Sequence, residues 1–421
     1  MNLYRCVPWA WLLTATLPGL AQEAAPPWQI GAFGTLGVMA TDTHKMGYYR
    51  DINQPADGAT DHLNLKTDSR LGLQVTRSFS DTFSATAQVV SRLQWDGSFK
   101  PEVNWAFLKW SPTPTLDLRA GRLGVEFNSM GDARDVGYSY LPVRPPQELY
   151  GKFGTNNFTG MDVTSTFPLG GALSLRVKAW GGSMVGKSPL RGYDQPLRLD
   201  GNPTGGLTAE LSGTYWRFKA SWSTLKIKHD WPGNTPAISD YLDQFAVILN
   251  DPVLHDTGTS LRLLNMRHDY FTGMFAWERG PLQFQVELER TRSDRLIFPD
   301  NWSGMTLLGY RLGKVVPYAM FGREVASHPE VNLGSLPSVP VQGPLLADLI
   351  RNALHFTKVD QATISAGARW DFRPGACLKF QVDQVKTFDS NGFFFALEPG
   401  WNGKARVFSV TLDFVFGGGG R

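Results

Sequence analysis

Every second position from Phe408 to Phe416 carries a large apolar side chain. Three polar residues, Ser409, Thr411 and Asp413, lie between them. Because successive side chains of a β-strand point to opposite faces, this segment would present one face to lipid and the other to water. The last strand of a soluble β-sandwich could carry the same pattern, so other segments must separate the two fold classes. The apolar set is Phe408, Val410, Leu412, Phe414 and Phe416.

The N-terminus has the pattern of an export signal. Arg5 precedes an uncharged, mostly apolar stretch that ends in the small-x-small sequence Gly19-Leu20-Ala21. This stretch is too short to span a bilayer comfortably, so residues 1–21 are predicted to be a cleaved signal peptide and residues 22–421 the mature chain. The mature chain keeps only Cys377, which excludes an intrachain disulfide. No Cys/His cluster remains, and the sequence predicts neither a metal site nor a cofactor.

The composition narrows the fold class further. No run of 18 or more apolar residues follows the predicted signal peptide, which argues against helical membrane spans. The 44 glycines and 12% aromatic residues suit many strands joined by turns. The formal net charge of +3 is too small to imply binding to nucleic acid. Since no linker divides the roughly 400 mature residues, one large barrel explains the length better than two soluble domains.

Alternation of apolar and polar residues predicts about sixteen strands. The polar positions, for example within residues 173–178, are too highly charged for a packed interior but suit a water-filled lumen. The predicted strands lie near 28–38, 70–76, 82–89, 102–110, 116–123, 157–167, 171–182, 205–213, 214–228, 268–278, 281–292, 303–313, 314–324, 361–372, 376–388 and 404–416.

The connections between these strands alternate in length. Short turns are typical of the periplasmic rim of outer-membrane barrels and long loops of the extracellular rim, whereas a β-sandwich has no reason to alternate in this way. The fold class predicted is therefore all-β, a transmembrane antiparallel β-barrel. The long loops are 41–67, 124–156, 183–204, 229–267 and 325–360. Tryptophans at strand ends fit interfacial girdles: Trp110, Trp180, Trp216, Trp277 and Trp370.

Several motifs resemble those of Gram-negative outer-membrane porins of the general, sixteen-stranded type. Residues 69–75 resemble the second porin strand, whose arginine lines the pore, and residues 118–123 resemble the Gly-Arg strand before the third loop. Residues 159–163 resemble the strand that leaves this loop, and residues 314–318 and the final aromatic strand are similar to their porin counterparts. The resemblance implies a passive diffusion channel for small hydrophilic solutes in the bacterial outer membrane, and no enzyme.

The resemblance also implies partners. Porins of this type are expected to form homotrimers, to contact outer-membrane lipid and lipopolysaccharide, and to be recognised by the barrel-assembly machinery through the last strand. That assembly signal would comprise Phe408, Val410, Leu412, Phe414 and Phe416. The glycine-rich tail after Phe416 departs from the family pattern, in which the aromatic residue usually ends the chain.

Residues 124–156 correspond by resemblance to a third loop folded into the lumen as a constriction. Its charges would face a basic wall across a narrow gap, where the field orients solutes and the gap limits their size. Alternation places more basic than acidic residues on the lumen side, which predicts a mild anion preference. The basic set is Arg70, Arg92, Arg119, Arg176, Arg217, Lys219 and Arg369, and the acidic set that offsets part of it is Glu210, Glu287, Glu289, Asp371 and Asp383. Arg122 has the opposite parity, although the family pattern favours it near the pore. The predicted constriction residues are Arg70, Arg92, Arg119, Arg122, Glu126, Asp132, Arg134, Asp135 and Arg144.

Two segments inside long loops have helical periodicity, 237–250 and 343–356. We expect these helices to cap the barrel mouth or to pack on a neighbouring loop; a ligand-gating lid is the less favoured interpretation. The 124–156 loop also lacks the dense acidic motif of enterobacterial porins.

Three other functions remain open at this point. A channel dedicated to one class of substrate, such as an anion or a saccharide, is compatible with the basic lumen positions. A barrel enzyme would need a nucleophile and a base within hydrogen-bond reach, and all seven histidines fall in predicted loops or at strand edges. A barrel could also serve as an adhesin or structural anchor.

Overall fold

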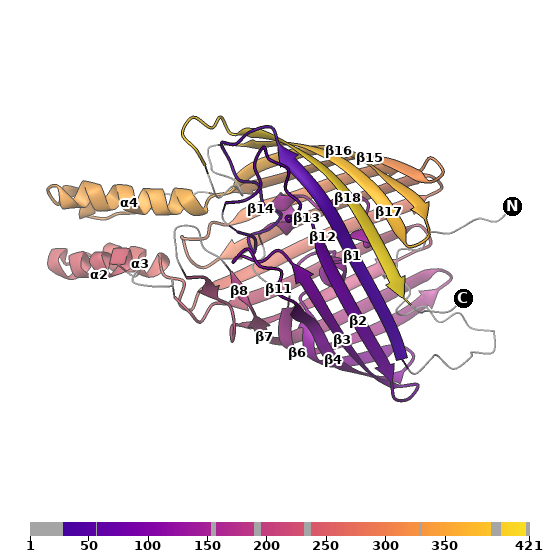
Figure 1. The fold of residues 1–421 in the computed structure, drawn as a ribbon. Helices are drawn as coiled ribbons and strands as arrows, with labels where there is room; N and C mark the ends of the chain where they lie inside the picture. The colour runs from indigo at the N-terminus through magenta and orange to yellow at the C-terminus, as the bar shows by residue number, and fades with distance from the viewer. Residues whose placement is uncertain are drawn as a thin grey trace.

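Sixteen antiparallel strands close into one barrel, in which β1 pairs with β18 (Figure 1). The computed structural model describes residues 28–55, 57–152, 157–188, 195–230, 237–327, 331–388 and 397–417. The predicted signal peptide, residues 1–21, lies outside these residues. Each of the sixteen predicted strand segments overlaps one barrel strand, so the predicted fold class is confirmed.

The barrel strands are β1 (Trp28–Thr41), β2 (Arg70–Ser78), β3 (Phe83–Arg92), β4 (Glu102–Thr113), β5 (Leu116–Gly124), β6 (Asn157–Gly170), β7 (Leu173–Val185), β10 (Pro203–Ser212), β11 (Trp216–Lys226), β12 (Arg267–Arg279), β13 (Leu282–Ser293), β14 (Asn301–Tyr310), β15 (Val315–Ala326), β16 (Asp360–Arg373), β17 (Ala376–Thr387) and β18 (Lys404–Gly417). A separate two-stranded sheet pairs β8 (Lys187–Ser188) with β9 (Leu197–Arg198). The α-helices are α1 (Gln147–Tyr150), α2 (Ala237–Leu249), α3 (Pro252–Ser260) and α4 (Gln342–Thr357), and the 3-10 helices are η2 (Gly131–Ala133), η3 (Gly137–Ser139) and η4 (Leu336–Ser338).

The two rims of the barrel differ in the length of their connections, as predicted. At one rim β4 and β5 are joined by residues 114–115, and β12 and β13 by residues 280–281. The longest connections, 125–156, 227–266 and 327–359, all belong to the other rim. The register that pairs Trp28 with Arg77 puts the start of β1 at the short-turn rim.

The outer surface of the barrel is apolar and its inner surface polar. On β16, for example, Ile364 is 62% exposed, whereas its neighbours Thr363 and Ser365 are 6% and 1% exposed. Trp110 and Trp370 lie on the exposed face, and Trp216 pairs with Trp277 across two strands, as an aromatic girdle requires. This contrast matches a wall with lipid on one side and a polar interior on the other.

Trp180 was predicted to belong to the aromatic girdle, and this prediction is wrong. Trp180 has the same parity as Lys178, so it points into the barrel, where it is buried against Phe127 and Phe158. Its position near a strand end resembled that of the girdle residues, but alternation along β7 places it on the other face.

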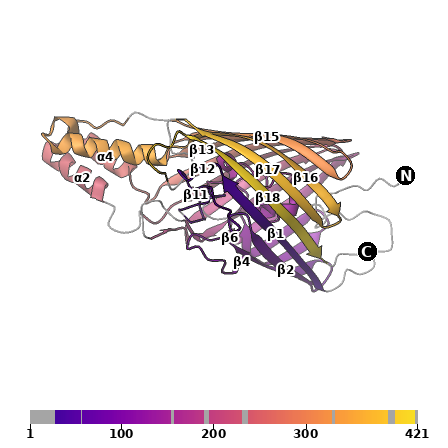
Figure 2. The same ribbon diagram turned by 45° about the horizontal axis from the view of Figure 1, so that its top comes forward.

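The two predicted loop helices are present as α2 and α4, with α3 as an addition. Figure 2 shows α2 and α4 beyond the long-loop rim. Leu242 of α2, Leu254 of α3 and Ile350 of α4 are fully buried in one apolar cluster, so the helices pack on one another, as predicted for a neighbouring-loop contact. Among the described helices, none combines the length and apolar character needed to cross a membrane.

Candidate functional site: the loop inside the barrel

The connection between β5 and β6 turns into the lumen directly after Gly124. Val125 and Phe127 are buried in the apolar cluster near the long-loop rim, where the Phe127 ring stacks on that of Tyr270 with centroids 4.7 Å apart. Thr272 on β12 donates a hydrogen bond of 2.7 Å to the Phe127 carbonyl oxygen. These contacts direct the next residues across the interior.

Glu126 joins the loop to the wall through two lysines. Its carboxylate lies 2.7 Å from Lys178 Nζ on β7 and 3.5 Å from Lys219 Nζ on β11. Lys178 also contacts Asp162, which pairs with Arg119 at 2.5 Å. Because Glu126, Lys178 and Lys219 are nearly fully buried, each charge depends on its partner.

A second group of contacts fixes the loop to β13, β14 and β15. The Ser129 backbone N–H donates to Glu287 at 2.7 Å, and the Tyr150 hydroxyl donates to the same carboxylate at 2.7 Å. Lys152 lies 2.7 Å from Glu289 and 3.7 Å from Glu324, and it donates to Ser303 at 2.5 Å. The two ends of the loop therefore meet at this wall.

The middle of the loop crosses to the opposite wall. Both oxygens of Asp135 lie 2.8 Å from Arg92 Nη1, and Asn104 donates to Asp135 at 2.8 Å. Arg70 donates 2.7 Å to the Asp135 carbonyl oxygen and 2.5 Å to the Tyr140 hydroxyl. Three strands, β2, β3 and β4, thus hold one turn of the loop.

Lys379 anchors the next residues of the inner loop. Lys379 Nζ donates to the carbonyl oxygens of Gly137, Tyr140 and Pro142 at 2.7, 2.7 and 3.0 Å. A side chain in place of Gly137 would collide with Asp413 and Thr35, so this position requires glycine.

Arg144 is the most enclosed charge of the loop, at 1% exposure. Its guanidinium pairs with Asp68 and, at 3.1 Å, with Asp383, and it donates to Ser409 at 2.6 Å. One side chain thereby joins the inner loop, the β1–β2 loop and strands β17 and β18.

Taken together, hydrogen bonds and ion pairs join the inner loop to at least twelve of the sixteen strands. The loop therefore spans the lumen from wall to wall and narrows the interior of the barrel. The strands are β2, β3, β4, β7, β11, β12, β13, β14, β15, β16, β17 and β18.

The predicted constriction residues divide into two groups. Arg70 and Arg144 are buried and hold the loop in place, and Arg134 donates to the Tyr150 carbonyl oxygen within the loop itself. The side chains of Arg92 and Arg119 keep 20% and 18% exposure, so they retain contact with solvent although each is paired. The side chain of Asp132 lies outside the part of the chain that the structure describes.

Arg122 does not lie with the other predicted constriction residues. It pairs with Ala106 on β4 and Thr159 on β6, and it alternates with the fully buried, inward-facing Leu123. Its side chain therefore takes the outward parity, and the expectation that placed it near the pore is corrected. The physical reason is the uninterrupted alternation of β5.

Sequence reasoning placed Lys219, Glu287, Glu289 and Asp383 on the lumen side without assigning them partners. Lys178 and Asp413 lie inward as the alternation of their strands predicts, and Lys379 occupies an inward position that the same rule could have found. Parity gives the face of a residue, whereas its partner depends on the path of the loop.

The comparisons with known proteins rest on structure alone. No protein-family model matches the chain, and no curated protein matches its sequence. Salmonella typhi OmpF, in a complex with daunomycin, superposes with a TM-score of 0.54 and 11% identity, over 92% of this chain and 97% of that one. The chain has the fold of the outer-membrane porins.

Two further structures support the same assignment of fold. OmpT with loop L8 deleted, an outer membrane protein of Vibrio cholerae, superposes with a TM-score of 0.53 and 12% identity, over 93% of this chain and 100% of that one. An anion-selective porin from Comamonas acidovorans gives a TM-score of 0.50 and 12% identity, over 92% of this chain and 98% of that one.

Proposed function

We propose that the chain is a passive channel of the bacterial outer membrane for small hydrophilic solutes. The observation that carries the proposal is a closed sixteen-stranded barrel with an apolar outside, a charged inside and a loop fastened across its lumen. A barrel of this width leaves room for an aqueous path, and an inner loop narrows that path to a size limit.

We further propose a mild anion preference. Arg176 on β7 and Arg217 on β11 point inward at the short-turn half of the barrel, and neither forms an ion pair with a described residue. Glu210 lies between them on β10 and offsets part of their charge. Since charges in water are screened over roughly 8 Å at physiological salt, only charges lining the narrow passage should select ions strongly.

A channel dedicated to one class of substrate is the second candidate. It is favoured by the extent of the contacts between the loop and the wall, because a passage confined by bonds to at least twelve strands discriminates by shape as well as by charge. Such a substrate would block ion current at millimolar or lower concentration, whereas a general channel would show no block.

An enzymatic barrel finds less support. Among the described contacts, His44 lies near Asp61 and His229 near the Asp200 carbonyl oxygen. His255 lies 2.8 Å from Asp243 on the exposed surface of the loop helices.

A homotrimer in the outer membrane is the proposed assembly. It is supported by a structure of Vibrio cholerae OmpT in its trimer form, which superposes with a TM-score of 0.51 and 11% identity. Chemical cross-linking of protein extracted in mild detergent should give a ladder that stops at the trimer; a ladder that ends at the monomer would contradict this assembly.

The test of the channel is ion conductance in planar bilayers. Purified, folded protein should give discrete steps, smaller than those expected for an unobstructed barrel of this width, and a zero-current potential that indicates anions in a KCl gradient. Protein that inserts but gives no steps above background would overturn the channel proposal.

A further inference from the structure

A β-bulge on β4 turns two consecutive side chains into the lumen. Gln88 on β3 pairs with Trp105 and Val89 pairs with Val103, so Asn104 is the extra residue of the bulge. Directly opposite residues of an antiparallel pair share a face, and Gln88 is buried inside the barrel, so Trp105 points inward. Asn104 is 4% exposed and points inward as well, whereas Val103 keeps the outward face at 42% exposure. Bulges re-aim side chains in this way and are frequent beside functional sites.

Trp105 offers one face of its ring to the lumen. The side chain is half-buried, and within the described part of the chain its indole N–H has no hydrogen-bond acceptor. The ring of Phe107 lies beside it, with centroids 6.5 Å apart and planes inclined by 54°. Phe107 is held from behind by the apolar cluster at the long-loop rim and from the side by the Arg119 guanidinium, 5.1 Å from its ring centroid. The two rings therefore form a supported aromatic surface on a wall that is otherwise polar.

This aromatic surface lies near mid-height of the barrel wall. Trp110, five residues further along β4, lies on the exposed face at the short-turn rim. At about 3.3 Å per residue and a tilt of about 40°, this separation puts Trp105 about 13 Å above Trp110, half the height of an apolar band of about 25 Å. The inner loop crosses the lumen at this level, because the neighbouring Asn104 donates a hydrogen bond of 2.8 Å to Asp135. Trp105 thus lies where the interior is narrowed.

Arg92 presents one edge of its guanidinium next to this surface. Asp135 contacts only Nη1 of Arg92, at 2.8 Å from each carboxylate oxygen. Within the described part of the chain, Nε and Nη2 of Arg92 have no acceptor, and the side chain keeps 20% exposure. Asn104 Nδ2 donates to the same Asp135 oxygen, Oδ2, and Trp105 is the next residue of the chain. The open edge of the guanidinium and the indole ring therefore border the same part of the lumen.

We propose that Trp105, Phe107 and Arg92 form a binding site for small aromatic carboxylates. This inference rests on the proposed function and names a class of solute for its second candidate, the dedicated channel. Nε and Nη2 of Arg92 form a side-on edge that donates to both oxygens of a carboxylate. The ring of the solute stacks on Trp105 and meets the edge of Phe107, an arrangement that aromatic pairs favour. An aliphatic anion lacks the ring and a neutral aromatic alcohol lacks the charge, so each uses only half of the site.

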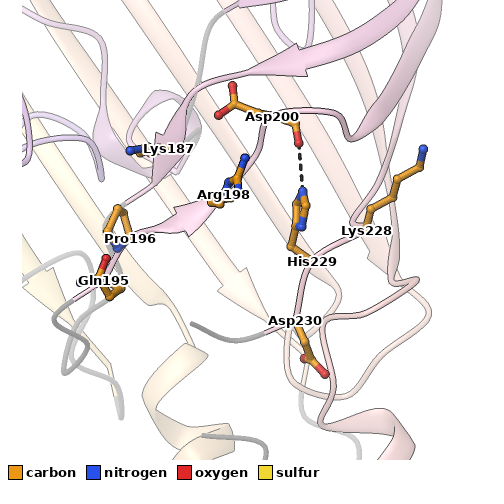
Figure 3. Close-up of a pocket in the computed structure, with 8 residues that line it drawn as sticks. All are labelled: Lys187, Gln195, Pro196, Arg198, Asp200, Lys228, His229 and Asp230. Carbon is orange, nitrogen blue, oxygen red and sulfur yellow. Dashed lines mark hydrogen bonds between the residues drawn. The ribbon is translucent and has the colours of Figure 1, made fainter. Parts of the chain in front are cut away.

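A cavity at the long-loop rim provides a matched control for the arginine. Figure 3 shows Arg198 in this cavity of about 580 Å³, together with Lys187 and His229. The lining residues include an arginine but no tryptophan or phenylalanine, so this cavity could attract a carboxylate without holding its ring. Replacement of Arg198 with Lys therefore makes the same chemical change as Arg92→Lys, but outside the proposed site.

Calorimetric titration of folded full-length protein in detergent tests the site, with benzoate, acetate and benzyl alcohol as probes. Trp105→Leu removes the ring, and Arg92→Lys keeps the charge that faces Asp135 but removes the side-on edge. The controls are Arg198→Lys and Trp95→Leu, which removes an exposed tryptophan of the β3–β4 connection. Because binding is measured and not conductance, protein that conducts but does not bind benzoate contradicts this inference alone. Protein that binds benzoate but does not conduct contradicts the channel proposal alone.

The wild type should bind benzoate at least tenfold more tightly than acetate or benzyl alcohol, a comparison that needs no variant. Both controls should bind benzoate as the wild type does, and each test variant should bind it at least tenfold more weakly. The proposal would be overturned if the wild type did not bind benzoate, or bound acetate or benzyl alcohol equally well. It would also be overturned if a folded test variant kept the affinity of the wild type, or if Arg198→Lys abolished binding.

Discussion

At the scale of single residues, buried ion pairs hold the inner loop in place. Arg144, Asp68 and Asp383 are each almost completely buried, so each charge depends strongly on its ion-pair partners. Removing one member of such a group leaves an uncompensated buried charge, which typically costs about 3–5 kcal/mol. The inner loop should therefore respond sharply to a single substitution.

Replacing Arg144 with Met should release the loop from β17 and β18. The two carboxylates left behind would draw water into the contact, so we expect a lower unfolding temperature and larger, noisier conductance steps. The measurements are heat-modifiable migration on gels and single-channel recording. Arg351→Met is the control, because its pair with Asp348 is 61% and 70% exposed and such surface pairs contribute little. Unchanged conductance in Arg144→Met would show that the loop is held without this residue.

Selectivity should depend on the inward arginines that have no partner. Replacing Arg176 and Arg217 together with Gln removes two positive charges from the short-turn half of the lumen while breaking no ion pair among the described residues. The zero-current potential in a KCl gradient should then shift toward cations, and more so at low salt, because screening weakens. An unaltered potential would assign the selectivity to the paired residues Arg92 and Arg119 instead.

Sequence reasoning identified the face of most lumen residues but not what they contact. Arg70 was correctly placed on the lumen side, yet it is buried against Tyr140 and holds the loop, a contact that depends on residues 70 positions apart. Arg122 and Trp180 show the complementary error, since a family pattern and a position near a strand end were each given more weight than parity.

The strands were the most predictable elements of the molecule. A period of two is repeated in all sixteen, because each must satisfy lipid on one face and a polar interior on the other. Helices α2 and α4 were predicted from their apolar stripes, whereas α3, Pro252–Ser260, has only nine residues and a weak pattern. Its formation depends on packing in the shared cluster and on the cap that Asp251 provides.

Phe416 should contribute to barrel closure and assembly. It lies on the outer face, 55% exposed, at the seam where it pairs with Ala32 of β1, and its ring centroid is 5.4 Å from that of Phe414. Replacing Phe416 with Ala should lower the folded, heat-modifiable fraction in outer membranes. Leu36→Ala, which truncates another outward residue of the same seam, is the control. Equal folded fractions would locate the assembly signal elsewhere.

The clamp between α3 and η4 should weaken in acid. Asp251 caps α3 through Val253 and accepts two hydrogen bonds of 2.7 Å from Ser335, and these hydroxyl and backbone contacts lower the pKa of its carboxyl. A lowered pKa in the folded state means that the stabilisation is present above the unfolded value of about 3.9 and is lost as pH falls below it.

Hydrogen exchange of residues 252–260 and 333–338 measures this clamp. The protection factor of the wild type, which is the intrinsic exchange rate divided by the measured rate, should fall below pH 4, and Asp251→Ala should show the lower protection factor already at pH 7. Asp256→Ala removes an exposed carboxylate from the same helix and should leave exchange unchanged. Equal protection of the Asp251→Ala variant and the wild type at pH 7 would mean that apolar packing alone holds the two elements.

At the scale of the whole molecule, the barrel wall and the inner loop have different roles. The wall is a continuous ladder in which each strand pairs with two neighbours, so its closure does not require the loop. The loop places its charges against wall residues of opposite sign, which fastens it across the interior. Stability should therefore depend mainly on the wall, and permeability mainly on the loop.

Replacing residues 126–152 by a short Gly/Ser linker should separate these two properties. The wall charges Lys178, Glu287 and Lys379 would become solvated by the widened lumen, so they would not remain as buried unpaired ions and the barrel should still assemble. Single-channel conductance should rise severalfold, with weaker ion selectivity. The matched control replaces residues 237–260, which contain helices α2 and α3 beyond the rim, and should leave conductance unchanged. A barrel that assembles without the inner loop yet conducts no better than the wild type would show that the narrowest part of the passage is made by other loops.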